Sequence, residues 1–595
     1  MTAAVVNSVL RFLSPGRLTG PIFDKELRVS SRRVRYYALR SSYLLLMTVF
    51  LVLVWLAEVR YRTYGPASFR ASRMARAGQN ITVFIIWFQF CATQLVAIIM
   101  LSTSISDEIY NRTLGLLMTT PINSFQVVMG KLFSRLLQLL LLMAVSLPIL
   151  AIVRVFGGVP WDYVLSSMCI TFTTLLFVSS LTLLCSVFSR RAYFVIILSI
   201  IILGIIFGLF PFIGFMLFED TTSENDLAAA ISHLNPYVML AFNTDAMLNP
   251  RGWLRTTALR WPLHCANMLA GSGVLLLISV SVVRKVALGQ ATGQLGGSFW
   301  PKRWLKPAVR RVREAAPRRV TGPAIFWKEL KTPILRRRKV TAFVIVSILT
   351  LLLLLTYLLC AEEGILDDQE IQAAYVAVLG GLAMLFTIIL PATTITSEKE
   401  SRSWPILMAT PLGDWQILLA KFAGIVRRIL PFWLFMFGHL ALFALCGYIH
   451  PVALVQFPVL VAWMTIFFTG TGLYFSARFK RTTTAVIMNF VFAAILWALI
   501  PLWMFLFAEM TKTSDDYAES YMNYNPVYQS AVLLDATSGS RYAERPVHGL
   551  HYNWFGARRT AWRTNEVLFT SLWAYTLVGL FFAWRAKCMF RKRIF

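Results

Sequence analysis

The residues best equipped for chemistry lie in hydrophilic stretches between long apolar segments. His548 and His551 are three residues apart, a spacing at which two imidazoles can ligate one metal ion. Adjacent carboxylates occur at 367–368 and 515–516. No cysteine and no glycine-rich cradle accompanies either set, and the seven cysteines of the chain include no CxxC pair. The sequence therefore predicts no catalytic residue, no cofactor-binding residue and no metal site.

Nucleotide chemistry would need a phosphate-binding loop of the pattern GxxxxGK followed by Ser or Thr. Gly130 and Lys131 supply the Gly-Lys pair, but the upstream glycine and the following hydroxyl are missing. The longest basic stretch, 285–339, is too short for a nucleotide-binding domain. If ATP drives this protein, a separate subunit must hydrolyse it.

One charged passage occurs twice, 290 residues apart: SDEIYNRTLGLLMTTP at 106–121 and TSEKESRSWPILMATP at 396–411. In each copy apolar residues follow the charges at helical spacing, and Thr-Pro closes the copy, because proline disfavours helix at the residue before it. The pattern predicts a helix of about ten residues, roughly 15 Å long, with one apolar side. Such a helix could dock a partner or pack under a helix bundle. The candidate residues are Glu108 and Glu398, Arg112 and Arg402, Leu117 and Leu407, Thr120 and Thr410, and Pro121 and Pro411.

The segments that must position these residues are apolar enough to cross a membrane. Hydrophobic residues make up 57% of the chain and charged residues 14%, against about a quarter charged in soluble domains. Twelve windows lack Asp, Glu, Lys and Arg, as transmembrane helices do and barrel strands do not. The fold class is therefore predicted to be an all-α integral membrane protein with twelve transmembrane helices. The windows are 41–57, 81–103, 136–153, 163–188, 192–218, 264–283, 340–360, 371–396, 429–449, 452–476, 482–508 and 567–584.

The same 290-residue interval relates most of the chain to itself. Pro211 aligns with Pro501, and the Asn-Pro pair at 235–236 aligns with the pair at 525–526. Six predicted helices separate equivalent positions, so both halves run in the same direction, as in transporters built from parallel repeats. The predicted domains are a first six-helix half at 1–284, a basic linker at 285–320 and a second six-helix half at 321–595.

The net charge of +29 is concentrated in particular hydrophilic stretches. Sixteen Lys or Arg and only two acids lie between residues 284 and 339, whereas loop 361–370 has five acids and no base. The positive-inside rule places the linker and both termini on the cytoplasmic side of the cytoplasmic (inner) membrane. Loop 58–80, with five Arg on the predicted outer side, is the exception. A basic face beside anionic membrane lipid accounts for the charge, so no nucleic-acid partner is predicted.

The repeated passage and the six-helix plan around it resemble the type-2 ABC transporter permeases (ABC-2 type). In that family the segment after the second helix couples to an ATPase subunit, an elbow helix precedes the first helix, and re-entrant helices precede the sixth. The resemblance implies coupling segments at 106–121 and 396–411, elbows at 22–38 and 325–339, and external re-entrant loops at 219–263 and 509–566. It also implies an ABC ATPase partner, in two copies, that holds ATP and Mg, with no cofactor in this chain.

This chain departs from the family pattern at one aligned position. Family members often carry Glu where Gly115 and Pro405 stand here. Proline inside a helix removes a hydrogen bond and kinks or breaks it. Pro405 is therefore expected to shorten or kink the second coupling helix, which would make the two ATPase contacts unequal.

These features predict the permease subunit of an ATP-binding cassette exporter. Gln89, Gln94 and Asn489, within apolar windows, could line the pathway or join helices by hydrogen bonds. Pro211 and Pro501 predict kinks late in the fifth helix of each half. Two other classes stay open. One is an ion-coupled secondary transporter, although the windows lack the acid or base that such coupling usually needs, and the other is a non-transporting membrane scaffold.

Overall fold

The computed structural model divides the chain into two compact units, unit 1 (Met1–Lys306) and unit 2 (Pro307–Phe595). The boundary between them falls within the predicted linker, 285–320. The structure describes residues 22–23, 25–26, 28, 34–55, 67–110, 113–115, 120, 122–154, 158–189, 192–217, 231, 233–249, 260–291, 322–331, 339–511, 516–538, 546–555 and 557–591.

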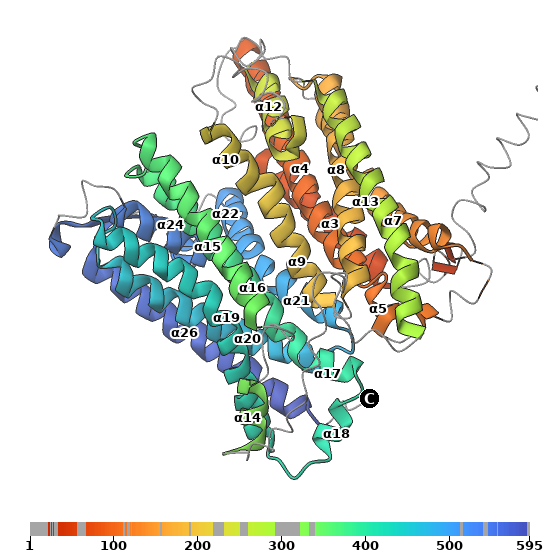
Figure 1. Cartoon of the computed structure of the whole chain (residues 1–595). Helices are drawn as coiled ribbons and strands as arrows, with labels where there is room; N and C mark the ends of the chain where they lie inside the picture. The colour runs from red at the N-terminus through yellow and green to blue at the C-terminus, as the bar shows by residue number, and fades with distance from the viewer. Residues whose placement is uncertain are drawn as a thin grey trace, which may run out of the picture. The chain divides into compact units, whose positions relative to one another are not determined.

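Unit 1 is built from long helices, drawn from red to yellow-green in Figure 1. Most of these helices are apolar along their length, and a helix satisfies its own backbone polar groups where no water is available. Its elements, including the π-helical turn η2, are α3 (Val34–Trp55), α4 (Ala67–Ser102), α5 (Ser106–Tyr110), α7 (Ser124–Arg154), α8 (Trp161–Phe188), α9 (Ala192–Gly204), η2 (Ile205–Leu209), α10 (Phe210–Leu217), α12 (Pro236–Leu248) and α13 (Trp261–Ala291).

Unit 2 repeats this order of long helices, and before its last helix it has two short helices and a β-hairpin (Figure 1). Its first elements are α14 (Ala324–Lys331), α15 (Lys339–Glu362), α16 (Gln369–Thr394), α17 (Thr396–Glu400), α18 (Trp404–Met408), α19 (Asp414–Leu445), α20 (Ala453–Arg478), α21 (Thr482–Ala494), the π-helical turn η5 (Ile495–Leu499) and α22 (Ile500–Thr511). After these come α23 (Asp516–Met522), α24 (Pro526–Thr537), the 3-10 turn η6 (Val547–Gly549), β1 (His551–Trp554), β2 (Ala557–Thr560) and α26 (Ala561–Met589).

The helices confirm an all-α membrane protein. Within the described ranges, ten helices are long and apolar enough to cross a membrane, five in each unit. Helix α3 is not among the ten, and the segment Val346–Glu362 of α15 is a shorter apolar helix. These two elements correspond to the first predicted span of each half, so the count of twelve stays a prediction.

One helix in each unit is more deeply buried than the other spans. In α8 and α20, 67% and 61% of the most apolar window is buried inside the protein. Helix α8 packs on α4 and α13, and α20 packs on α16 and α26. Where α20 crosses α26, Gly470 faces Gly579 so closely that a Cβ atom on Gly470 would overlap the Gly579 carbonyl. Helix α20 is therefore the central helix of unit 2.

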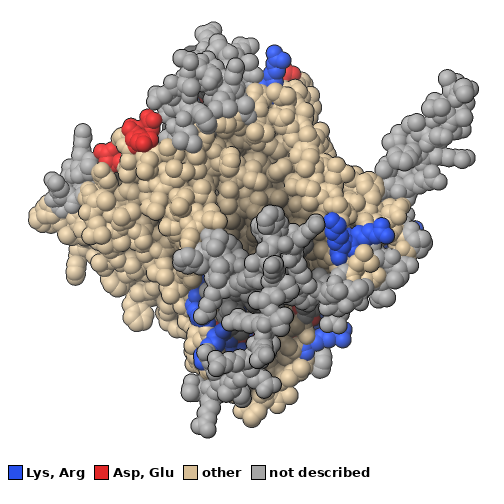
Figure 2. Space-filling model, viewed as in Figure 1, with Lys and Arg blue, Asp and Glu red and all other residues tan. Residues whose placement is uncertain are grey.

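The outer surface of the long helices is apolar. Strongly exposed apolar side chains include Leu277 on α13, Leu351 on α15, Leu445 on α19 and Trp573 on α26. On the face shown in Figure 2, the visible charged side chains gather near the helix ends, and the surface along the helices is uncharged. A water-soluble protein rarely exposes so large an apolar surface, whereas a membrane-embedded one must.

The segment before the last helix of unit 2 contains a β-hairpin that the sequence analysis did not predict. Strands β1 and β2 pair antiparallel, with Tyr552 opposite Arg559. The buried Tyr552 hydroxyl donates to Gln456 of α20 at 3.1 Å, and the Trp554 indole donates to Thr564 of α26 at 2.9 Å. The hairpin is thus fastened to the ends of two long helices.

Candidate functional site

In unit 1 the predicted coupling segment (106–121) begins with helix α5, which carries Glu108. The Glu108 carboxylate lies 3.1 Å from the Lys131 ammonium of α7, whose side chain is only 7% exposed. Lys131 also donates to the Ser104 carbonyl at 2.7 Å. After α5, the Thr113 N–H donates to the Glu108 carbonyl at 3.0 Å, and the Thr113 hydroxyl donates to the Glu108 carboxylate. Glu108 therefore closes the turn after α5 and ties this segment to α7.

In unit 2 the coupling segment (396–411) contains two one-turn helices, α17 and α18, separated by a tight turn. The Ser403 N–H donates to the Glu398 carbonyl at 3.0 Å and the Arg402 N–H to the Lys399 carbonyl at 3.1 Å. This pair of bonds is the Schellman motif, which needs a left-handed residue at the position of Arg402.

Arg402 occupies that left-handed position with φ of 54°, and it is the one described non-glycine residue with a positive φ. Glycine is the usual residue there, because a side chain in this conformation costs about 1–2 kcal/mol. Backbone strain of this kind clusters at functional sites. The exposed Arg402 side chain is therefore a candidate contact group in its own right.

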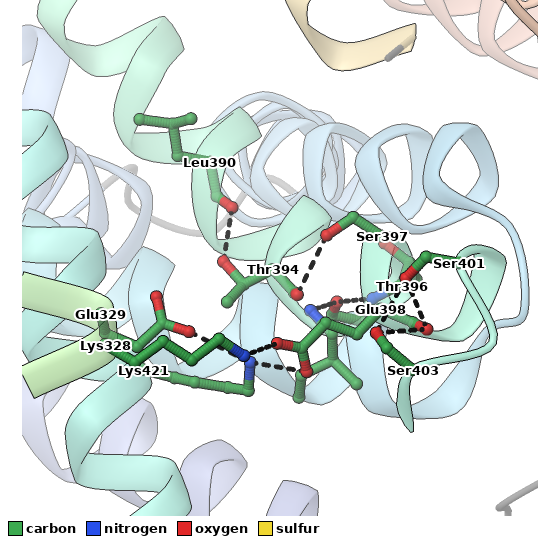
Figure 3. A network of polar contacts seen from close by, with 12 residues as sticks. Lys328, Glu329, Leu390, Thr394, Thr396, Ser397, Glu398, Ser401, Ser403 and Lys421 are labelled. Carbon is green, nitrogen blue, oxygen red and sulfur yellow. Dashed lines mark hydrogen bonds and ion pairs between the residues drawn. The ribbon is translucent and has the colours of Figure 1, made fainter. Parts of the chain in front are cut away.

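Lys421 of α19 joins the coupling segment of unit 2 to the elbow helix α14 (Figure 3). Its Nζ lies 2.9 Å from Glu398 Oε2 and 3.7 Å from Glu329 Oε1, and its side chain is 1% exposed. The 2.9 Å contact lacks the alignment of a hydrogen bond, so it is an ion pair. Arg428 adds a 3.0 Å bond to Glu329, and Lys328 lies 3.6 Å from Glu398. Three bases and two acids thus bind α14, α17 and α19 into one charged block.

The elbow of unit 1 is anchored by a different pair. Glu26, which aligns with Glu329, lies 3.5 Å from Arg135 of α7. The position equivalent to Arg428, three residues after Arg135, is occupied by Gln138. The buried amide of Gln138 has no hydrogen-bond partner in the described part of the chain. In unit 1 the elbow and the coupling segment are therefore fastened to α7 by separate ion pairs, and Lys25 of the elbow, which aligns with Lys328, also attracts the Glu108 carboxylate.

The coupling segment of unit 2 also rests on the junction between α20 and α21. The Ser476 hydroxyl, at the end of α20, accepts hydrogen bonds from the N–H groups of Ile395 and Thr396, both at 2.9 Å. The Glu400 carboxylate accepts from the Thr482 N–H, at the start of α21, at 2.7 Å. A displacement of the segment would therefore act directly on three long helices, α19, α20 and α21.

Helix α18 has one buried and one exposed face. Trp404 and Met408 lie one turn apart and are buried, and the Trp404 ring meets the Phe590 ring edge to face at 5.3 Å. Ile406 lies on the opposite side and is 72% exposed. Leu407 is half-buried against the apolar core of unit 2. Sequence reasoning selected Leu407 and missed Ile406, although helical spacing from Trp404 would have placed Ile406 outward.

Two points about the second coupling helix need correction, namely its length of about ten residues and the kink that was one of the two effects expected of Pro405. It is not one helix of about ten residues, because the turn at Arg402 divides it into α17 and α18. Pro405 does not kink α18, because it lies in the first turn, where an N–H has no partner within the helix. Pro405 therefore starts a helix instead of breaking one.

The structure places the predicted coupling residues in different environments. Glu108 and Glu398 face lysines of their own unit and not the surface. Thr120 and Pro411 are exposed. The Thr410 hydroxyl donates to the Leu407 carbonyl at 2.6 Å. The remaining predicted residues, Arg112, Leu117 and Pro121, lie outside the described residues.

The three polar residues predicted to line a pathway or join helices make hydrogen bonds within their own units. Gln89 accepts from Ser146 and donates to the Met168 sulfur at 3.3 Å. Asn489 donates to the Ile388 carbonyl at 2.8 Å and accepts from Thr471 at 2.9 Å. These contacts join helices, and joining helices was one of the two roles predicted for these residues; the other was to line a pathway.

Gln94, the third of these residues, accepts from the Tyr237 hydroxyl of α12 at 2.9 Å. Burial raises the pKa of Tyr237 to about 12, so its hydroxyl remains a donor at physiological pH. Gln94 thus joins α4 to a helix of the predicted re-entrant loop.

Pro211 and Pro501 both follow a π-helical turn. Pro211 is the second residue of α10, after η2, and Pro501 is the second residue of α22, after η5. Both prolines are buried. The hydrogen-bond pattern of the fifth helix therefore changes from α to π just before each proline, and the kinks stay a prediction.

Two regions of the chain match known protein families. Residues 20–285 match a family described as ABC-2 family transporter protein. Residues 364–586 match a second family of the same description. Among curated proteins, no sequence matches this chain. Nearly all of unit 1 and most of unit 2 are thus covered by matches of one kind.

Proposed function

Because the chain belongs to the ABC-2 transporter family and carries two of its permease domains, we propose that separate ABC ATPase subunits drive it by alternating access. The chain itself is a multi-pass membrane permease. In this proposal it is an exporter whose two halves rock against each other as the ATPase subunits close.

The observation that carries the proposal is the attachment of the coupling segments. In each unit a lysine of the next long helix binds the glutamate of the coupling segment, with the lysine buried. Buried ion pairs hold two elements in fixed register, since breaking one leaves an uncompensated charge. A push on either segment would therefore reach α7 or α19 without being absorbed by a flexible loop.

The side chains left free for the ATPase are those that do not face the interior. In unit 2 they include Arg402, held in a strained backbone conformation, and the exposed Ile406. An apolar anchor beside a cation is a common pattern at the centre of protein interfaces. The ATPase surface is expected to supply a small apolar pocket with an acidic group near it.

The partner would bind in two copies, one at each coupling segment, and would hold the ATP and Mg. The coupling segments would lie on the cytoplasmic side of the inner membrane, with both termini of the chain. The basic residues between 284 and 339 support this orientation through the positive-inside rule.

Co-purification of the tagged chain from its native membrane in mild detergent tests the proposal. The expected result is an ATP-binding subunit at two copies per chain. Ile406→Asp is expected to lower this to one copy, because it puts a charge on the apolar anchor of unit 2. The matched control is Val547→Asp, an exposed apolar residue of η6, which should leave two copies bound.

Recovery of the chain without an ATP-binding subunit, from membranes that express candidate ATPases, would contradict the proposal. Two copies bound to the Ile406→Asp variant would instead retain the ATPase partner and remove Ile406 from the interface. The first result tests the proposed function, and the second tests only whether Ile406 contacts the ATPase.

A further inference from the structure

The fifth helix of each unit carries a carbonyl that its own helix cannot satisfy with an α-helical bond. Pro211 has no N–H, so the Phe207 carbonyl, four residues earlier, lacks its α-helical donor. Pro501 has the same effect on the Trp497 carbonyl. Both carbonyls lie within the π-helical turns, in spans where no water can replace the missing donor.

In both units an asparagine from another helix supplies the donor. Asn235 Nδ2 donates to the Phe207 carbonyl at 2.8 Å, and Asn525 Nδ2 donates to the Trp497 carbonyl at 2.8 Å. The two asparagines align at the 290-residue interval, as do the two carbonyls. The same contact therefore occurs twice within separate units.

Each asparagine also begins the helix that follows it. Asn235 Oδ1 accepts the N–H of Tyr237 at 3.0 Å, and Asn525 Oδ1 accepts the N–H of Val527 at 3.0 Å. These are helix N-cap bonds at the starts of α12 and α24. Each buried amide thus binds two helices. Its oxygen accepts a hydrogen bond from the helix that the asparagine begins, and its nitrogen donates one to the fifth helix.

We propose that Asn235 and Asn525 are positioning residues that lock α12 and α24 to the π-helical turns of the fifth helices, so that each pair moves as one rigid body. If α24 moved away from η5, the Trp497 carbonyl would be left without its donor in an apolar environment, which is unfavourable. The joint therefore stays closed during transport. This inference goes beyond the proposed function and does not depend on the ATPase partner.

Unit 2 has a second contact at the same joint. The Tyr521 hydroxyl of α23 donates to the Leu496 carbonyl of η5 at 2.7 Å. Burial raises the pKa of Tyr521, so this donor stays protonated. The aligned residue in unit 1 is Ile231, whose side chain cannot donate. The tyrosine contact of unit 2 therefore has no counterpart at the aligned position of unit 1.

A distance measurement between α22 and α24 tests the proposal on the full chain in lipid nanodiscs. Spin labels are placed at the exposed positions Phe507 and Val527 after Cys91, Cys446 and Cys588, the exposed cysteines, are replaced by Ser. The joint predicts a single narrow distance distribution between the labels by electron–electron resonance.

Asn525→Asp keeps the N-cap acceptor and removes the donor to Trp497. The ratio of closed to open joint is expected to fall about five- to tenfold, the size of one lost hydrogen bond. Asn525→Ser, which caps α24 but is too short to reach Trp497, should act in the same way without adding charge. The decisive comparison repeats Asn525→Asp in a Pro501→Ala background, because an alanine in place of this proline restores an N–H for the Trp497 carbonyl and removes the penalty for opening the joint.

Three results decide the outcome. Broadening in both Asn525 variants, with no further broadening when Asn525→Asp is added to Pro501→Ala, supports the proposal, since a general loss of folding would add to either background. An unchanged distribution in Asn525→Asp and Asn525→Ser would overturn it. Equal broadening by Asn525→Asp with and without Pro501→Ala would also overturn it, because the asparagine would then act on something other than the freed carbonyl.

Discussion

Units 1 and 2 hold their coupling segments by the same kind of contact but with different partners. In unit 1 Lys131 binds one carboxylate and one backbone carbonyl, and the elbow has its own pair, Glu26 with Arg135. In unit 2 Lys421 lies between two carboxylates, and the elbow shares its network. The position of the anchoring arginine differs by three residues, about one helical turn.

This difference shows that the two coupling segments are not equivalent. The lysine and the glutamate stand at aligned positions, so their pairing is common to both units. The elbow anchors do not align, so each unit links its elbow to its long helix in a separate way. A force on the segment of unit 2 would move its elbow through the shared Lys421, whereas in unit 1 the described ion pairs pass the force through α7, beside the weaker attraction between Lys25 and Glu108.

Removing the central lysine should have the largest effect and should separate the units most clearly. Lys421→Met is expected to destabilise the protein by about 3–5 kcal/mol, because it leaves buried carboxylates without their shared base. Lys131→Met leaves Glu108, whose side chain is 26% exposed, and should cost about 1–3 kcal/mol. The apparent melting temperature of each purified variant measures the difference.

Lys480→Met is the control for the loss of a lysine charge as such, because Lys480 is exposed and follows the end of α20. Its melting temperature should match that of the unmodified protein. A larger loss for Lys131→Met than for Lys421→Met would show that the shared network of unit 2 is not the tighter one.

The unpartnered amide of Gln138 offers a test in the opposite direction. Gln138→Leu is expected to stabilise unit 1 by about 1–3 kcal/mol, because a buried polar group without a hydrogen bond carries a penalty of that size. Thermal unfolding of the variant should shift to higher temperature. A shift to lower temperature would mean that the amide has a partner at the elbow and that the two units are more alike than their ion pairs indicate.

Arg402→Gly should relieve the left-handed strain in the turn of unit 2 by about 1–2 kcal/mol. At the same time it removes the guanidinium proposed to contact the ATPase. The expected result is a higher melting temperature together with weaker recovery of the partner. Ser401→Gly is the matched control, since a glycine at an ordinary negative φ gains nothing and loosens the turn. Unchanged recovery with Arg402→Gly would remove Arg402 from the interface.

Tyr521→Phe should have the smallest effect and should make the external joint of unit 2 resemble that of unit 1. Loss of the bond to the Leu496 carbonyl is expected to cost about 0.5–1.5 kcal/mol. Amide hydrogen exchange in the stretch 495–511 should rise, while exchange in 205–217 stays the same. If Tyr521→Phe leaves amide exchange in 495–511 unchanged as well, Asn525 alone holds the joint.

The sequence predicted the elements whose physics is local. Charge-free windows predicted long membrane helices, because apolar length is what a bilayer requires. The Asn-Pro pairs at 235–236 and 525–526 stand where α12 and α24 begin, since asparagine caps a helix and proline fits its first position. The repeat predicted coupling segments at 106–121 and 396–411, and Pro405 predicted that their two ATPase contacts would be unequal.

The parts that the sequence did not predict depend on contacts between distant residues. Whether Glu398 faces a partner or Lys421 is decided by the packing of α17 against α19, which no local pattern encodes. The hairpin was missed because each strand has only four residues, and the Phe-Gly pair between them is not one of the usual two-residue hairpin turns. The hydrogen bond from Asn525 to the Trp497 carbonyl was missed as well, because it joins two helices across 28 residues of sequence.

The crossing of α20 and α26 has a consequence for genetics. Every amino-acid substitution of glycine adds at least a Cβ atom, and the site at Gly470 has no volume for one because the Gly579 backbone fills it. Missense alleles at Gly470 should therefore behave as loss-of-function alleles whatever residue they encode. A mutational scan would report Gly470 and Gly579 as an essential pair, and that signal would mark the central helix of unit 2, not a site for cargo or a partner.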